Sequence, residues 1–158
     1  VVTLRESIGG AWLLGIVMVF MAIFVAYISI SINYSNAFRM KTEMVTLVEE
    51  YEGINPTSLN RLQGIMDKYG YRNKISCKID TEHSVIGVTD QIVTKNPTTK
   101  QSYCVVREER PAQDGSEPKY YYTIYVSFAF NLPMLGDLFH FQVNGETNAI
   151  LYPNDTNF

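Results

Sequence analysis

The residues best suited to covalent chemistry are two cysteines, Cys77 and Cys104, and the chain contains no others. An even cysteine count in a domain that follows a membrane segment suggests one disulfide in an oxidising compartment; the alternative is two buried free thiols. In the chain-entropy treatment, whose mechanism is disputed, closing a loop of this size contributes about 3 kcal/mol. If formed, the bond would join the first and third strands of the sheet predicted below.

The other side chains with catalytic or metal-binding potential are scattered. The two histidines, His83 and His140, do not stand at ligand spacing from a cysteine, so no metal site is predicted. Asp80 and Glu82 have the oxygens to bind a cation, but a solvated turn is the simpler interpretation. The sequence has no phosphate-binding glycine loop and no Gly-x-Ser-x-Gly elbow. We therefore expect no enzymatic activity and no cofactor.

Composition restricts the partners further. The net charge is −3 and the isoelectric point is near 5.4, which gives no electrostatic reason to expect nucleic acid. Asn154-Asp155-Thr156 fits the N-glycosylation pattern, although such triplets are common by chance. It falls in residues 154–158, which are predicted to form an exposed tail.

A long N-terminal helix must position whatever this chain presents. Residues 7–38 contain no charge, and residues 8–32 are nearly all apolar. At about 1.5 Å per residue, this run is long enough to cross the roughly 30 Å hydrocarbon core of a bilayer. It is about twice as long as the apolar core of a secretory signal. We interpret residues 1–33 as a transmembrane or filament-core helix.

This helix is predicted to continue to residue 52, because no proline precedes Pro56. Its second half, residues 34–52, is amphipathic and is expected to pack on the core of a domain spanning residues 34–158. Gly53 is expected to end the helix. Asn55 would then cap a short second helix over residues 56–69. The predicted apolar stripe, interrupted only by Lys41, is Tyr34, Ala37, Phe38, Lys41, Met44, Val45, Val48 and Tyr51.

An antiparallel sheet is predicted over residues 73–150, where apolar and polar residues begin to alternate as they do in strands. The fold class is therefore α+β: a long hydrophobic helix whose second half packs on a C-terminal antiparallel sheet, with one short extra helix. The predicted strands are 75–79, 84–93 with a bulge or bend at Gly87, 103–108, 121–132, and a fifth from residue 139 with a bend or bulge at Asn144-Gly145.

Two parts of the sequence resemble type IV pilins and their tight-adherence (Tad-type) relatives. Val2-Thr3-Leu4-Arg5-Glu6 is similar to the Phe-Thr-Leu-Ile-Glu start of mature pilins, and the same kind of apolar helix follows it. Residues 122–150 look like the end of TadE-like proteins, with an alternating strand, a proline-containing apolar turn and a final strand. The sequence departs from the pilin pattern at Arg5, where pilins usually carry an apolar residue, and by the additional Val1.

The resemblance implies a role for Glu6. In that family a peptidase cuts just before the motif, and the glutamate neutralises the amino terminus of a neighbouring subunit in the filament. A carboxylate at the edge of an apolar helix is costly without a partner and is favoured at a helix N-terminus, which agrees with this role. The alternative is that Arg5 and Glu6 simply mark a membrane interface.

The apolar helix also carries small residues that allow helices to approach closely, notably Gly9, Gly10 and Gly15. Contacts of this kind between copies extend as a helical filament when they do not close into a ring. The alternative is that glycine is simply frequent in membrane helices.

The resemblance therefore implies an extracellular filament subunit of the Tad type, acting in adhesion or surface interaction. Its expected partners are further copies of the chain, a membrane before assembly, prepilin peptidase and the pilus assembly machinery. It would reside in the inner or cytoplasmic membrane before assembly and at the cell surface afterwards. Two alternatives remain: a single-pass membrane-anchored extracytoplasmic binding protein, and a minor pseudopilin that acts in assembly.

Overall fold

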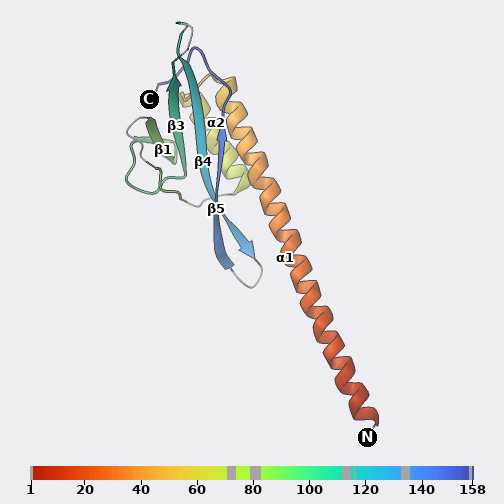
Figure 1. Cartoon of the computed structure of the whole chain (residues 1–158). Helices are drawn as coiled ribbons and strands as arrows, with labels where there is room; N and C mark the ends of the chain where they lie inside the picture. The colour runs from red at the N-terminus through yellow and green to blue at the C-terminus, as the bar shows by residue number, and fades with distance from the viewer. Residues whose placement is uncertain are drawn as a thin grey trace.

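The computed structural model describes residues 2–70, 74–78, 83–111, 115, 117–132, 136–156 and 158, with the backbone alone for residues 2–9, 129–132 and 136–140. Two helices and one antiparallel sheet confirm the predicted α+β class (Figure 1). The helices are α1 (Val2–Glu50) and α2 (Pro56–Tyr69). The strands are β1 (Ser84–Thr89), β2 (Ile92–Lys95), β3 (Tyr103–Arg110), β4 (Lys119–Leu132) and β5 (Gly136–Glu146).

The sheet has the strand order β2-β1-β3-β4-β5, and every neighbouring pair is antiparallel. Because side chains alternate between faces, the paired residues Val105 and Ile124 share the face that packs on both helices. Cys104 and Tyr125 are paired on the opposite face. The main core consists of Met40, Met44, Val48, Ile54, Leu59, Leu62, Met66, Ile86, Val88, Tyr103, Val105, Tyr122, Ile124, Val126 and Ile150.

The stripe by which α1 joins this core differs from the predicted one. Its buried members are Ala37, Met40, Met44 and Val48, at spacings of three, four and four residues. Tyr34 and Phe38, which were expected in the stripe, are 55% and 41% exposed. At about 100° per residue, they lie roughly 80–120° around the helix from Met44. The prediction omitted Met40, which continues the true stripe.

The junction between the helices follows its predicted chemistry. Gly53 has a φ of 132°, and the chain reverses there after α1 ends at Glu50. The Asn55 side chain accepts a hydrogen bond from the Ser58 amide at 2.9 Å, and the Ser58 hydroxyl accepts one from the Asn55 amide at 2.9 Å. This reciprocal capping box satisfies two donors at the start of α2.

Four predictions about the strands are wrong. Residues 84–93 form two strands, because Asp90 and Gln91 turn the chain with φ values of 50° and 66°. Ile75 makes only an isolated bridge to Gln101, so the predicted first strand is not found among residues 74–78.

The irregularity between β4 and β5 lies at Phe130/Asn131, and Gly145 stays in register with Ile124. Gly87 is likewise paired without a break. Ile79, Asp80 and Glu82 lie outside the described residues.

Gly145 is required by the contact between β5 and α1. A Cβ atom there would lie 2.7 Å from Cγ2 of Val45 and 2.9 Å from Cγ of Lys41. These distances are shorter than ordinary carbon–carbon contacts. The absence of a side chain at position 145 therefore allows α1 to lie directly against the sheet.

We expect Gly145→Val to lower the free energy of unfolding by about 1–3 kcal/mol, because the added side chain overpacks this contact. Urea titration of the full-length chain in detergent micelles, followed by circular dichroism, would measure the change. Gly64→Ala in α2 is the control, because a Cβ atom there meets nothing within 4 Å. The control should be neutral or stabilising by up to about 1 kcal/mol. Equal effects of the two variants would contradict the close approach.

Candidate assembly surface

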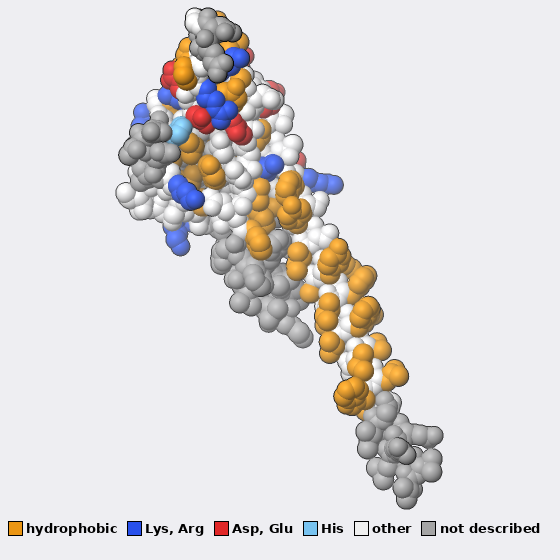
Figure 2. Space-filling view, viewed as in Figure 1, with side chains coloured by type: hydrophobic (Ala, Val, Ile, Leu, Met, Phe, Trp, Pro, Cys, Tyr) orange, Lys and Arg blue, Asp and Glu red, His pale blue; other side chains and the backbone are white. Residues whose placement is uncertain are grey.

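The apolar half of α1 lies outside the globular part of the molecule. None of residues 10–36 is buried, and large side chains such as Trp12 and Phe20 are exposed. Figure 2 shows hydrophobic side chains along this part of the helix. In the described part of the chain, α1 is the one helix long and apolar enough to cross a membrane. By length and composition, it is a candidate membrane anchor or signal sequence.

The predicted assembly residues lie in this half. Glu6 and Gly9 belong to α1, but the surroundings of their side-chain positions lie outside the structure's description. A Cβ atom at Gly10 or Gly15 would meet nothing within 4 Å, so the fold of the single chain does not require either glycine. Gly15 is at a shallow hollow of about 410 Å³, lined by Ala11, Trp12, Gly15, Ile16 and Val19. These positions form one helix face that is open to close approach from outside.

Charge is segregated along α1. After Glu6, the next charged residues are Arg39, Lys41 and Glu43. Glu43 belongs to the globular part, where its Oε1 accepts hydrogen bonds from the Tyr69 hydroxyl at 2.7 Å and from Lys68 Nζ at 3.0 Å. The described apolar half therefore presents an uncharged surface, with the cations Arg39 and Lys41 at the end nearer the globular part.

The C-terminal residues are only in part the exposed tail that was predicted, because Asn154 and Thr156 are exposed but Asp155 is held in the fold. The side chain of Asp155 is only 5% exposed. Its Oδ1 accepts a hydrogen bond from the Ile54 amide at 2.7 Å. Its Oδ2 accepts one from Arg107 at 2.9 Å and one from the Tyr122 hydroxyl at 2.6 Å. We call these four residues the C-terminal clasp; they hold the chain end against the turn after α1 and against β3 and β4.

The clasp restricts its neighbours as well. Burial, together with the hydrogen bond to Asp155, raises the pKa of Tyr122, so its phenol remains a donor at physiological pH. A Cβ atom at Gly53 would lie 2.5 Å from Oδ1 of Asp155, so a side chain there would displace the carboxylate. Asn154, the acceptor of the predicted glycosylation motif, is exposed. Its backbone amide donates to the Glu52 carbonyl at 2.7 Å.

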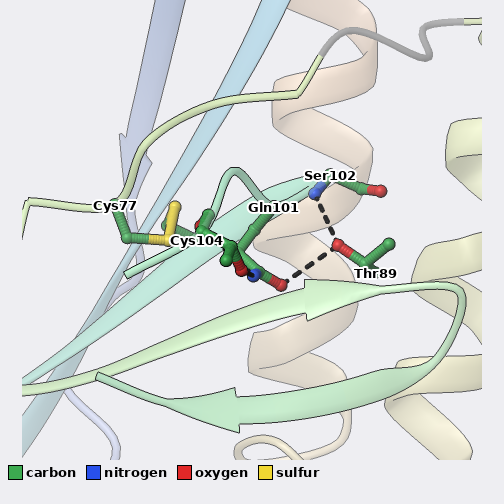
Figure 3. The surroundings of a disulfide bond; sticks show 6 residues. Cys77, Thr89, Gln101, Ser102 and Cys104 are labelled. Atoms are coloured by element: carbon green, nitrogen blue, oxygen red, sulfur yellow. Dashed lines mark hydrogen bonds between the residues drawn. A yellow bond between two sulfur atoms is a disulfide. The ribbon is translucent and has the colours of Figure 1, made fainter. Parts of the chain in front are cut away.

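Cys77 and Cys104 form a disulfide with their Cα atoms 5.6 Å apart (Figure 3). The predicted pairing is therefore present, and the free-thiol alternative does not hold. Cys104 is buried in β3, and the bond holds residues 74–78 against the sheet face opposite the helices. Beside it, the Thr89 hydroxyl hydrogen-bonds Gln101 Oε1 at 3.0 Å. These contacts are structural and leave no cysteine free.

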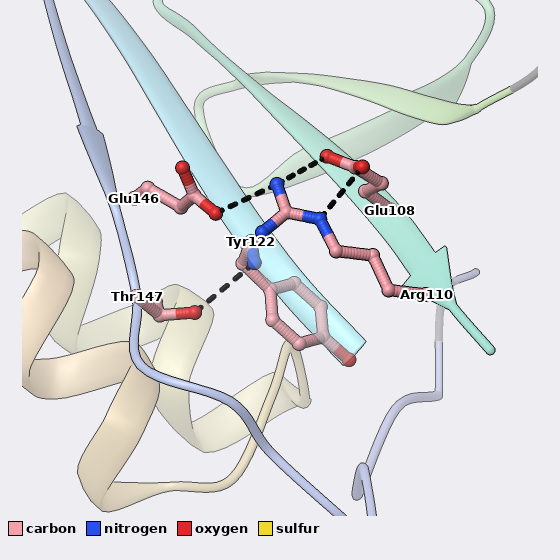
Figure 4. A network of polar contacts seen from close by, with 5 residues as sticks. All are labelled: Glu108, Arg110, Tyr122, Glu146 and Thr147. Carbon is pink, nitrogen blue, oxygen red and sulfur yellow. Dashed lines mark hydrogen bonds and ion pairs between the residues drawn. The ribbon is translucent and has the colours of Figure 1, made fainter. Parts of the chain in front are cut away.

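A second polar group ties the end of β3 to that of β5 (Figure 4). Arg110 binds both carboxylate oxygens of Glu108, at 2.8 and 2.9 Å, and lies 3.0 Å from an oxygen of Glu146. The hydrogen bond from Arg110 lowers the pKa of Glu108. Because these side chains are 35–45% exposed, each pair contributes less than about 1 kcal/mol to stability.

The described residues contain no cluster of three or more His, Cys, Asp or Glu side chains that could hold a metal ion. His83 is half-buried just before β1, and the side chain of His140 is outside the description. The buried carboxylate of Asp155, which sequence reasoning missed, has three donors around it and serves as a structural acceptor.

No protein-family model, curated protein or solved structure matches this chain. The likeness to pilins therefore remains a prediction from the residues that carry it.

Proposed function

We propose that the protein is a structural subunit of an extracellular type IV-like filament of the Tad type, assembled through the apolar half of α1. The observation that supports this proposal is that the two halves of one continuous helix have different surroundings. From Ala37 onward α1 is part of the domain core, whereas none of residues 10–36 is buried. An exposed apolar surface of this length requires a bilayer or other protein around it.

A filament subunit would have such surroundings both before and after assembly. Before assembly the helix satisfies its own backbone hydrogen bonds in lipid. After assembly the same face would pack on equivalent helices, and the open positions at Gly10 and Gly15 suit close approach. Glu6 would neutralise the amino terminus of the neighbouring subunit, and residues 54–158 would form the outer surface.

A second candidate is a single-pass membrane-anchored binding protein. It is favoured by an open groove of about 690 Å³ between α1 and α2. Charged side chains of both signs line this groove, including Glu43, Arg61 and Lys68. In this alternative the apolar helix remains in lipid and Glu6 is dispensable.

Electron microscopy of material sheared from cells that produce the chain, with immunogold directed at residues 54–158, would test the proposal. We expect gold along thin filaments. Gold only at filament tips would indicate a minor subunit. Label that remains wholly in the membrane, with no filaments, would contradict the filament and favour the anchored binding protein.

Glu6→Ala should abolish filaments while the chain stays in the membrane fraction, because the amino terminus of the neighbouring subunit would lose its partner charge. Glu50→Ala is the matched control, since Glu50 is an exposed carboxylate at the other end of the same helix. The control should assemble normally. Normal filament yield from Glu6→Ala would remove the assigned role of Glu6.

A further inference from the structure

The β4–β5 hairpin continues well past the rest of the sheet. β3 last pairs with β4 at Tyr103–Val126, whereas β4 and β5 remain paired as far as Leu132–Gly136. Residues 127–132 and 136–142 therefore form a two-stranded hairpin arm. In Figure 1 the arm points in the same direction as the apolar half of α1.

The hairpin arm reaches the level of that apolar half. Val143 packs beside Ala37 of α1 with Phe128, and Gly136 precedes Val143 by seven positions along β5. At about 3.3 Å per strand residue this distance is at most about 23 Å, the rise of about 15 helical residues. Counted back from Ala37, this places the end of the arm beside the apolar segment.

The arm has few charges, an exposed aromatic side chain and, in the described part of the chain, unpaired strand edges, which are unfavourable in water. Asp137 is the only charged residue between Lys119 and Glu146 in the sequence. Phe141, on the described part of the arm, is 45% exposed although its ring stacks on Phe128. Among the described residues, no further strand pairs with either outer edge of the arm, and an isolated two-stranded hairpin is only marginally stable in water.

The adjacent surface of α1 has the chemistry of a lipid headgroup region. Tyr34 and Phe38 are exposed, with ring centroids 4.7 Å apart, and Lys41 Nζ lies 4.8 Å from the Phe38 centroid. Arg39 and Lys41 are the only charges between Glu6 and Glu43, and both are positive. Exposed aromatic rings with cations at the end of an apolar helix are typical of a membrane interface. Tyr34, Phe38, Arg39, Lys41 and Phe141 together are called the junction patch.

We propose that the hairpin arm and the junction patch dock onto an anionic lipid surface, so that the domain rests on the bilayer. The occupant is lipid because the arm extends the surface of the candidate span and the two charges on the adjoining part of α1, Arg39 and Lys41, are both positive, against the single negative charge of Asp137 on the arm. The arm lies at headgroup depth, since open strand edges cannot be satisfied in hydrocarbon. This proposal rests on the membrane stage of the proposed function and is independent of filament assembly.

Tryptophan fluorescence of the full chain in vesicles would test the docking. Trp12 is the only native tryptophan. Trp12→Phe combined with Phe141→Trp places a tryptophan reporter on the arm. If that variant does not fold, Trp12→Phe combined with Phe38→Trp places the reporter on α1 instead. The matched control is Trp12→Phe with Tyr152→Trp, because Tyr152 is 68% exposed near the opposite end of α1, beside Glu49 and Glu52. The vesicles contain phosphatidylglycerol and phosphatidylcholine brominated near the headgroup end of its acyl chains.

We expect the reporters at positions 141 and 38 to lose emission to the brominated lipid and to shift to the blue, while the reporter at 152 does neither. Arg39→Gln with Lys41→Gln should reduce that quenching, whereas Lys95→Gln with Lys100→Gln should not. If Trp12 of the wild type is quenched but positions 141 and 38 behave like 152, the docking proposal is overturned. A concentration-dependent blue shift without quenching would overturn it in favour of contact with a second copy.

The two proposals fail in different ways. Quenched reporters on a chain that forms no filaments would leave the docking intact and reject the filament. An unquenched Trp12 would reject the membrane span, and the docking with it.

Discussion

Asp155→Ala should lower the free energy of unfolding by about 3–5 kcal/mol, the usual cost of removing one partner from a buried charge pair. The substitution leaves Arg107, the Tyr122 hydroxyl and the Ile54 amide without their acceptor. The side chain of Arg107 is only 23% exposed, so water replaces the lost carboxylate poorly. Urea titration of the full-length chain in detergent micelles would measure the loss.

Two further variants separate the clasp from general surface effects. Asp155→Asn keeps an acceptor oxygen but loses the charge, so its cost should be intermediate. Glu108→Gln breaks the exposed pairing with Arg110 and should cost less than about 1 kcal/mol. A loss for Asp155→Ala no larger than that for Glu108→Gln would show that the clasp does not hold the fold.

Removing the disulfide should have the second large effect. Cys77 and Cys104 are 27 residues apart. For a loop of that length, the chain-entropy treatment gives about 3–4 kcal/mol at 25 °C. The Cys77→Ala and Cys104→Ala double variant should unfold at correspondingly lower urea concentration, because residues 74–78 would retain only the Ile75–Gln101 bridge among their described backbone pairings.

Reductant provides the complementary test. Reduced wild type should unfold at about the same urea concentration as the double variant, which itself should not respond to reductant. Thiol alkylation read by mass spectrometry would verify that reduction is complete. An unchanged unfolding midpoint after complete reduction would contradict the stabilising role of the bond.

Features with a local periodic signal were predictable from the sequence. The unbroken helix, the Asn55 cap and the buried alternation of Tyr122, Ile124 and Val126 all follow from residues a few positions apart. The split between β1 and β2 was missed because Asp90-Gln91 adopts positive φ without glycine or asparagine, the usual signal for such a turn.

Features formed by distant residues were not predictable in this way. Asp155 meets Arg107 across 48 positions and Ile54 across 101, so no local pattern distinguishes it from a solvated acid. In the candidate site, Gly10 and Gly15 could be named from the sequence. That the single chain leaves both positions open could be seen only once α1 was placed against the sheet.

The C-terminal clasp also determines how the molecule would respond to mechanical force. Ile54 lies just beyond the end of α1, whereas Arg107 and Tyr122 belong to the middle of the sheet. A pull on the domain against an anchored α1 would therefore load the clasp at the same time as the Met44 and Val48 packing. The two attachments would share the tension, so the sheet would separate from the helix in one abrupt rupture instead of peeling away gradually.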